Sequence, residues 1–400
     1  KTCYRFASIS KTFTAVAIMQ LVDRKKLSLD DTVVSYLPWF KTKNKELLSD
    51  TITIRQLLSH SGGVFRDGVT PHWVTDQFPA REGLKKSISK ATLVFENATQ
   101  FKYSNFGFAL LGEVIRKVGG MSYDDYAQQH ILTPLGMKKT APDFRTDTDR
   151  WLARGYARII PNADRDRYEH AKANAYASAT GFLSNVEDLA LYLGSLSLAR
   201  NDNRILTRES RKELFREHVK TGRKEKTYCL GFDSELIEDH GVVGHGGGFA
   251  GFITRISLDL DNDIGVIVLT NSNESSAVAT TKGIFKTIYA LAEKSNGAPA
   301  RKSKIAPLHT YEGLYRSRWG DELVVSVGSH LISFDPQTSD PIKNVTTLQP
   351  YKQNCFILHP ASRYDSPGEY ARFIRDPKSK KVRTVQWGSQ LLERVAERYD

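Results

Sequence analysis

A serine and a lysine with helical spacing stand near the start of the chain. In Ser8-Ile9-Ser10-Lys11 the two residues lie one helical turn apart, so a helix would place both side chains on one face. A hydroxyl nucleophile needs a base to take its proton. A buried lysine whose pKa is lowered by desolvation can act as that base. The pair therefore indicates a serine nucleophile activated by a lysine.

The same four residue types recur as Ser87-Ile88-Ser89-Lys90. In a chain of 400 residues, chance matches to such a short pattern are expected. Spacing alone therefore does not distinguish a nucleophile from the polar face of a helix, at either copy.

A second group with chemical potential is Tyr103-Ser104-Asn105, directly ahead of a segment with helical periodicity. A tyrosine close to a lysine can exist partly as phenolate and shuttle protons, while an asparagine amide can hold a substrate carbonyl. By itself, the tripeptide is equally typical of an ordinary turn before a helix.

The third group is the glycine-rich run Gly244-His245-Gly246-Gly247-Gly248. It matches a dinucleotide-binding pattern, but a predicted strand follows it where that pattern needs a helix N-terminus. It also matches the oxyanion loop of lipases, which require a G-x-S-x-G nucleophile elbow that this sequence lacks. We interpret the run as a strand whose glycines let a substrate lie against the backbone.

Periodicity predicts the elements that must position these groups. Helical spacing of apolar residues predicts helices over residues 8–24, 106–118, 186–196 and 277–293. Short β-type runs occur at 228–234, 242–245, 252–259 and 264–270, the last two joined by turn residues into an antiparallel hairpin. Helices in the middle of the chain and antiparallel strands late predict an α+β domain.

Residues 295–307 are rich in proline, glycine and charge and poor in apolar residues, which is typical of a linker. We therefore predict a first domain over 1–294 and a second over 308–400. About eight short strands, spaced by roughly 8–12 residues, follow this linker and predict a small all-β barrel or sandwich.

Composition limits the classes of partner. The chain carries 57 Lys and Arg against 45 Asp and Glu, a net charge of +12, but the excess is dispersed. We therefore expect a basic surface and no nucleic-acid partner. No apolar run is long enough for a transmembrane helix. The cysteines form no CxxC pair, the histidines form no HExxH, and His240 and His245 would point to opposite faces of a strand, so neither a metal nor a cofactor is expected.

Taken together, these motifs resemble the serine β-lactamase and penicillin-binding-protein-like family, in its branch with class C β-lactamases, D,D-peptidases and family VIII esterases. The resemblance rests on motifs in the same order along residues 1–294, namely Phe6–Thr14 for the S-x-x-K helix, Leu57-Leu58-Ser59-His60-Ser61-Gly62-Gly63 for "LLTHTSGL", Phe101–Gly107 for "F-x-Y-S-N-x-G", Pro134-Leu135-Gly136-Met137 for "PLGM" and His245-Gly246-Gly247 for K-T-G or H-x-G. Ser8, not Ser87, matches the family order.

The resemblance implies a β-lactamase/transpeptidase-like fold, an antiparallel sheet flanked by helices, and a serine acyl hydrolase. Ser8 would form the acyl-enzyme, and Lys11 and Tyr103 would move the proton. Asn105 and His245, with Gly247, would bind substrate, and the amides of Ser8 and Gly248 would form the oxyanion hole. The substrate would be a small ester or a peptide, with peptides that contain D-amino acids included in this class.

His245 takes the position of the K-T-G lysine, and an ordinary histidine is mostly neutral near pH 7. We therefore expect weak β-lactamase activity, because the lysine attracts the antibiotic's carboxylate. A non-catalytic, penicillin-recognising binding or sensor protein is the alternative, and a homo-oligomer is compatible with either function.

Family members carry further strands ahead of the S-x-x-K helix, whereas seven residues precede Ser8 here. Either those strands, with any targeting segment, are missing from the sequence, or the sheet is completed in another way, and no compartment is predicted. The segment from Tyr311 to Gly388 resembles the lipocalin-like β domain appended to many such hydrolases, on "Y-x-G-x-Y" and the rhythm of its strands.

Overall fold

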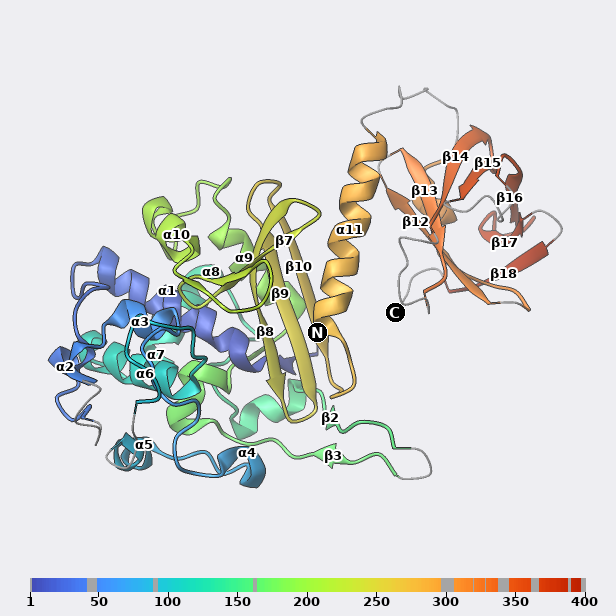
Figure 1. Cartoon of the computed structure of the whole chain (residues 1–400). Coiled ribbons are helices and arrows are strands. Elements are labelled where there is room, and N and C mark those ends of the chain that lie inside the picture. The colour runs from blue at the N-terminus through green and yellow to red at the C-terminus, as the bar shows by residue number, and fades with distance from the viewer. Residues whose placement is uncertain are drawn as a thin grey trace. The chain divides into compact units, whose positions relative to one another are not determined.

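A computed structural model describes residues 2–41, 49–88, 93–160, 164–295, 306–318, 320–327, 329–336, 345–360, 367–387 and 390–396. The chain divides into two compact units, Lys1–Thr281 and Lys282–Asp400 (Figure 1). This division falls within helix α11 (Ala277–Ser295). The linker expected over 295–307 lies almost wholly outside the described residues, so the domain boundaries 1–294 and 308–400 stay a prediction.

The first unit is built on a six-stranded antiparallel sheet in the order β10-β9-β8-β7-β6-β5. Each strand pairs with its neighbour in sequence, as expected of a meander joined by short turns. The strands are β5 (Val219–Lys220), β6 (Lys226–Tyr228), β7 (Asp233–Ile237), β8 (His240–Phe249), β9 (Phe252–Asp259) and β10 (Ile264–Thr270).

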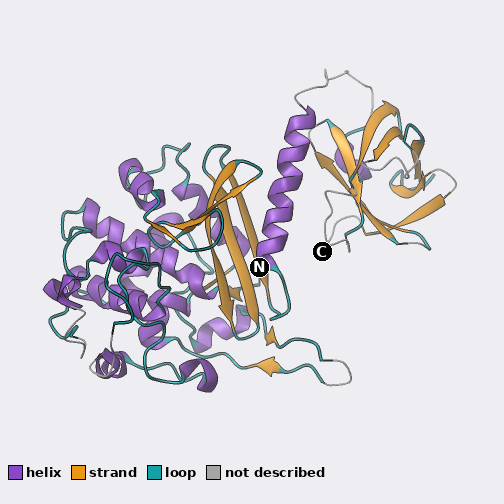
Figure 2. Cartoon of the chain, viewed as in Figure 1, coloured by secondary structure: helices purple, strands orange, loops and turns teal. Residues whose placement is uncertain are grey.

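Helices gather on one side of this sheet (Figure 2). They are α1 (Ser10–Asp23), α2 (Val33–Tyr36), α3 (Ile54–Leu58), α4 (His72–Thr75), α5 (Arg81–Ile88), α6 (Asn105–Gly119), α7 (Tyr123–Ala127), α8 (Thr133–Leu135), α9 (Val186–Leu196) and α10 (Arg208–Phe215). Two-stranded pairs join β1 (Tyr4–Arg5) to β4 (Leu183–Ser184) and β2 (Gly155–Tyr156) to β3 (Arg167–Tyr168). Among the shorter helical turns, η1 (Ala7–Ile9) and η6 (Ala177–Gly181) border the site described below.

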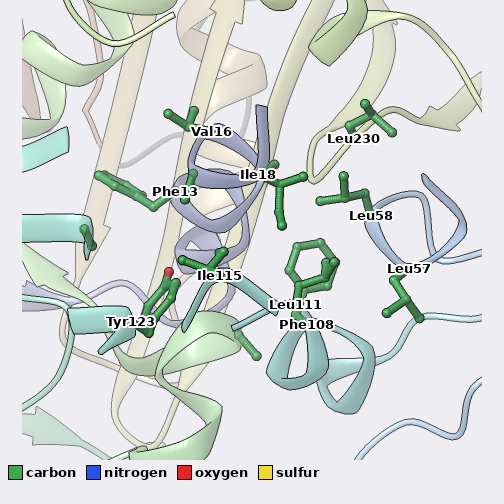
Figure 3. Packing of buried hydrophobic residues seen from close by; sticks show 14 of the residues in the cluster. Phe13, Val16, Ile18, Leu57, Leu58, Phe108, Leu111, Ile115, Tyr123 and Leu230 are labelled. Carbon is green, nitrogen blue, oxygen red and sulfur yellow. The ribbon is translucent and has the colours of Figure 1, made fainter. Parts of the chain in front are cut away.

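Helix α1 lies at the centre of the helical layer, and every residue from Ser10 to Leu21 is buried. A helix that is buried on all sides needs neighbours on all sides. Phe13 stacks on Tyr192 with ring centroids 3.9 Å apart and on Phe182 at 4.6 Å. Figure 3 shows Ile18 on the same helix pointing toward Leu58 of α3 and Phe108 of α6, whereas Val16 points away from them. This packing fixes the helix that begins directly after Ser8.

The helices expected over 106–118 and 186–196 match α6 and α9, and α6 ends on Gly120 in the left-handed region (φ +73°). The strand expected over 228–234 is wrong, because β6 ends at Tyr228 and β7 begins at Asp233. The chain turns between them at Gly231 (φ +75°), where an added Cβ would lie 2.9 Å from the carbonyl oxygen of Lys11. The turn is therefore pressed against α1, which local periodicity does not reveal.

The second unit contains a closed eight-stranded antiparallel barrel. Its strands are β11 (Gly313–Arg316), β12 (Asp321–Val327), β13 (His330–Phe334), β14 (Thr346–Lys352), β15 (Cys355–Pro360), β16 (Tyr370–Arg375), β17 (Val382–Trp387) and β18 (Gln390–Ala396). Pairing of β11 with β18 closes it, so the predicted barrel is confirmed and the sandwich is not formed. Buried aromatic and aliphatic side chains, including Tyr315, Phe356 and Phe373, make up its core.

We predict that Phe13→Ala lowers the free energy of unfolding of the helical unit by about 3–5 kcal/mol, because it removes a fully buried ring from a packed aromatic stack. Chemical denaturation followed by far-ultraviolet circular dichroism measures this. Val74, which is 86% exposed, provides the control Val74→Ala, whose curve should match wild type within about 0.5 kcal/mol. Equal midpoints for all three proteins would contradict the central role of α1.

Candidate active site

Ser8 lies in the helical turn η1, immediately before α1, and is half-buried. The chain enters this turn through Ala7, which adopts a left-handed conformation (φ +49°) that is unfavourable for a residue with a Cβ. Such a conformation persists where surrounding contacts determine it. Here Ser10 Oγ donates to the carbonyl of Ala7 at 2.5 Å and accepts from the amide of Phe182 at 3.1 Å. The position of Ser8 is therefore held from both sides.

Lys11 lies one turn after Ser8 and is fully buried. Its Nζ lies 3.1 Å from Ser8 Oγ, 2.7 Å from Asn105 Oδ1 and 2.8 Å from the carbonyl oxygen of Ala179. Burial lowers the pKa of Lys11 well below 10.5; nearby Asp67 opposes the shift. A neutral amine has two N–H donors and one lone pair. Asn105 Oδ1 and the Ala179 carbonyl can only accept, so in the neutral form of Lys11 they would take the two hydrogens, and the lone pair would face the Ser8 hydroxyl.

Tyr103 approaches the same pair from the loop before α6. Its hydroxyl hydrogen-bonds with Ser8, and Lys11 Nζ lies 4.8 Å from the centre of its ring. Burial raises the pKa of Tyr103 above its ordinary value, and the bond with Ser8 opposes that shift only in part. Burial thus favours the neutral phenol over the phenolate that the sequence left open, and a neutral Tyr103 is able to donate or relay a proton.

Asn105 is the first residue of α6 and links Lys11 to a carboxylate. Its Oδ1 accepts from Lys11, and its Nδ2 donates to Asp67 Oδ1 at 2.6 Å. The preceding Ser104 caps the helix, because its Oγ accepts the amide of Gly107 at 2.8 Å. The cap and the carboxylate together fix the amide orientation of Asn105.

The sequence did not identify two residues that support the site, Asp67 and His60. Asp67 also accepts from Trp73 Nε1 at 2.8 Å, and no spacing signal connects it with Asn105. His60 lies in the segment that resembles "LLTHTSGL", but the sequence assigned no role in the site to this histidine. Its Nδ1 accepts the amide of Ser104 at 3.1 Å, and its ring centre lies 4.3 Å from that of Tyr103. Both residues therefore hold the Tyr103–Asn105 segment in place.

His245 lies on β8 and is almost completely buried. Its Nδ1 lies 2.6 Å from the carbonyl oxygen of Gly246, which can only accept, so Nδ1 carries the proton. Its Nε2 then accepts from the hydroxyl of Tyr228 at 2.9 Å. Burial lowers the pKa of His245 from 6.5 to about 4, although Asp233 opposes the shift. His245 is therefore neutral at pH 7 with both nitrogens engaged, and Tyr228 is a further residue that the sequence analysis missed.

The glycines of β8 allow this strand to pass close to the nucleophile turn. A Cβ at Gly247 would lie 2.0 Å from the carbonyl oxygen of Phe6, so only glycine fits there. Gly248 is exposed, and a Cβ there would meet little besides Ile253. The first residue of β7, Asp233, pairs with Gly244 of β8. The residues of β8 after Gly244 therefore have no partner in β7. This leaves a backbone edge next to η1 against which a substrate can lie.

The structure thus brings Ser8, Lys11, Tyr103 and Asn105 into one bonded cluster, with His245 and Gly247 on the adjoining strand. Ser87 lies elsewhere, buried at the end of α5, and its partner Lys90 falls outside the described residues. Within the described part of the chain, no group of three or more histidine, cysteine or acidic side chains is arranged to hold a metal ion. None of the described helices is long and apolar enough to cross a bilayer.

Known proteins share this architecture. The chain is similar to protein flp of Staphylococcus aureus strain MW2, with 27% identity over 277 residues, which are 68% of this chain and 53% of that protein. The chain thus spans about half the length of the curated relatives it matches. Its fold resembles the octameric penicillin-binding protein homologue from Pyrococcus abyssi (TM-score 0.63, 24% identity, 98% of this chain and 88% of that one).

A D-stereospecific amidohydrolase from a Streptomyces species is similar in fold over 70% of this chain and 85% of that one, with TM-score 0.61 and 24% identity. The family model described as Beta-lactamase matches residues 1–288. The five motifs, the helix-flanked antiparallel sheet and this match agree, and the chain belongs to the Beta-lactamase family.

Proposed function

We propose that this protein is a serine acyl hydrolase that works through an acyl-enzyme on Ser8. One observation carries the proposal: the Nζ of the buried Lys11 lies 3.1 Å from Ser8 Oγ, and its other two partners, Asn105 Oδ1 and the Ala179 carbonyl, can only accept. A neutral amine in this position would therefore keep its lone pair beside Ser8 Oγ. That arrangement suits a general base for a hydroxyl nucleophile. A lysine that only stabilised the fold would not need to face a half-buried serine.

In the proposed reaction, Ser8 Oγ attacks the substrate carbonyl carbon while Lys11 Nζ takes the hydroxyl proton. The resulting oxyanion would be stabilised by the backbone amides of Ser8 and Gly248, where one such donor contributes about 3 kcal/mol. The carbon–oxygen or carbon–nitrogen bond to the leaving group then breaks as Tyr103 passes a proton to that group, and Lys11 returns the proton it took from Ser8 to Tyr103. In the second half, water gives a proton to the Lys11–Tyr103 pair and attacks the acyl carbon. The bond to Ser8 Oγ then breaks, and the pair passes that proton to Ser8 Oγ.

We propose small esters and peptides, including D-amino-acid derivatives, as the substrate class. The D-stereospecific amidohydrolase of similar fold is compatible with this class. Weak β-lactamase activity follows from His245, which is neutral and bonded to Tyr228 and Gly246. A lysine at that position would offer a permanent cation to the lactam carboxylate, whereas esters and amides without that carboxylate lose nothing.

We predict that a fluorophosphonate probe labels the full chain and that Ser8→Ala abolishes labelling and lowers turnover by about 10³-fold or more, because the nucleophile is lost. Ser87→Ala, which removes the hydroxyl from the other copy of the pattern, should keep both. Intact-mass spectrometry measures the labelling. A folded protein that takes no label would instead support the non-catalytic binding or sensor alternative.

The lowered pKa of Lys11 predicts the pH dependence of kcat/KM. Protonation of the amine removes the base, so activity toward a neutral ester should fall as pH drops through the pKa of Lys11 and level off above it. Because burial holds that pKa well below 10.5, the plateau should be reached before an ordinary lysine would lose its proton. Steady-state rates corrected for spontaneous hydrolysis test this. A kcat/KM that still rises at about pH 10 would show a lysine of ordinary basicity.

Substrate preference gives an independent prediction. We expect kcat/KM for p-nitrophenyl acetate or a D-alanyl p-nitroanilide to exceed that for nitrocefin by roughly tenfold or more, the effect of losing one charge-assisted hydrogen bond. Ser8→Ala supplies the background rate for each substrate. Nitrocefin turnover equal to that of the better of the other two would refute the argument from His245.

A further inference from the structure

The positive charges around Ser8 differ sharply in their availability. Lys11 is buried and engaged with three partners, and His245 is neutral. Arg66 remains: its guanidinium carbon lies 5.2 Å from the ring centre of Tyr103, and its side chain is 61% exposed. An exposed cation therefore rests on the ring whose hydroxyl bonds to Ser8.

Arg66 belongs to a loop whose backbone is hydrogen-bonded to the residues at the start of α6. The amide of Phe106 donates to the carbonyl of Arg66 at 3.0 Å, and Ser104 Oγ donates to the carbonyl of Phe65 at 2.7 Å. Tyr176 donates to the carbonyl of Asp67 at 2.7 Å. The backbone of the loop is thus fixed relative to Tyr103 and Asn105.

The side chain of Arg66 is oriented as well. Its Nε donates to Asp67 Oδ2 at 3.1 Å, while Asp67 Oδ1 is held by Asn105 and Trp73. Among the described residues, the guanidinium has no other hydrogen-bond partner, so its two terminal nitrogens stay available. A guanidinium held on one edge and by stacking on a ring presents its remaining donors in a fixed fork, the geometry that pairs with a carboxylate.

We propose that Arg66 is a specificity-determining residue that binds a carboxylate on the substrate, outside the bond that is cleaved. The proposal rests on the proposed function of Ser8 and deepens it. A flexible chain can turn its carboxylate to the outer face of Tyr103, whereas a fused β-lactam holds its carboxylate beside the reacting carbonyl. Because Asp67 balances the charge of Arg66, we expect the preference for anionic over neutral substrates to arise from direct contact in the bound complex. The preference should therefore appear in KM.

Matched ester pairs test this. On the acyl side, mono-p-nitrophenyl adipate is compared with p-nitrophenyl hexanoate, which has a methyl group in place of the carboxylate. On the leaving-group side, 4-acetoxybenzoate is compared with 4-methylphenyl acetate. For each pair, the ratio of kcat/KM, anionic over neutral, is measured in wild type and in Arg66→Gln, so that differences in intrinsic reactivity cancel.

We expect Arg66→Gln to lower this ratio by about 5- to 20-fold in one pair, mainly through KM. The pair affected assigns the carboxylate to the acyl or the leaving group. Arg66→Lys, which keeps the charge but loses the fork, should fall in between. The control is Arg204→Gln, which removes one exposed positive charge away from the site. Arg204 precedes Ile205, whose carbonyl accepts from Gln20, a residue near the far end of α1 from Ser8. This variant should leave both ratios unchanged.

Unchanged ratios in Arg66→Gln for both pairs, with Ser8-dependent turnover present, would overturn the proposal and leave the proposed function standing. An equal fall for anionic and neutral esters would also overturn it, because Arg66 would then act only through Tyr103. Absence of any Ser8-dependent turnover of all four esters would be a failure of the proposed function, and it is distinguished by the missing fluorophosphonate label.

Discussion

The buried amine of Lys11 is the constraint on which the rest of the site depends. It is far from water, so its charged form is disfavoured, and it must still satisfy its hydrogen-bonding groups. It does so with partners from three segments, Ser8 before α1, Asn105 at the start of α6 and Ala179 in η6. One polar atom thus sets the relative position of three elements, and the apolar surround of α1 favours the neutral form of that amine.

Neutral polar groups recur around this amine. Tyr103, His60, Tyr228 and His245 lie in contact, with His60 4.8 Å from Tyr228 and Tyr103 6.3 Å from His245 between ring centres. Burial favours the uncharged form of each one. A site lined with uncharged donors and acceptors is suited to stabilising charge that appears only during the reaction, because those dipoles are already oriented.

The sheet contributes backbone rather than side chains. Strand β8 can approach the turn that carries Ser8 because Gly247 has no Cβ to collide with Phe6. An ion pair also joins the two strands on either side of β8. Arg255 of β9 donates two hydrogen bonds of 2.6 Å to Asp233, the first residue of β7. A strand edge and a helix start that are both held by such contacts would suit the proposed acyl transfer, since small displacements of the reacting groups reduce rate strongly.

The sequence by itself predicted the fold class, several main elements and the candidate site residues. Helical periodicity located α6 and α9, turn residues located the β9–β10 hairpin, and the ordered motifs selected Ser8 over Ser87. Local patterns could not show which protonation states are favoured, because burial is a property of the assembled core: the sequence left a phenolate form of Tyr103 open, whereas its burial favours the neutral phenol. Nor could they reveal Asp67, Tyr228 or Arg66, whose partners are distant in the chain or arise from a loop with no periodicity. Only the tertiary structure decided these, because hydrogen bonds and desolvation depend on what surrounds a group in space.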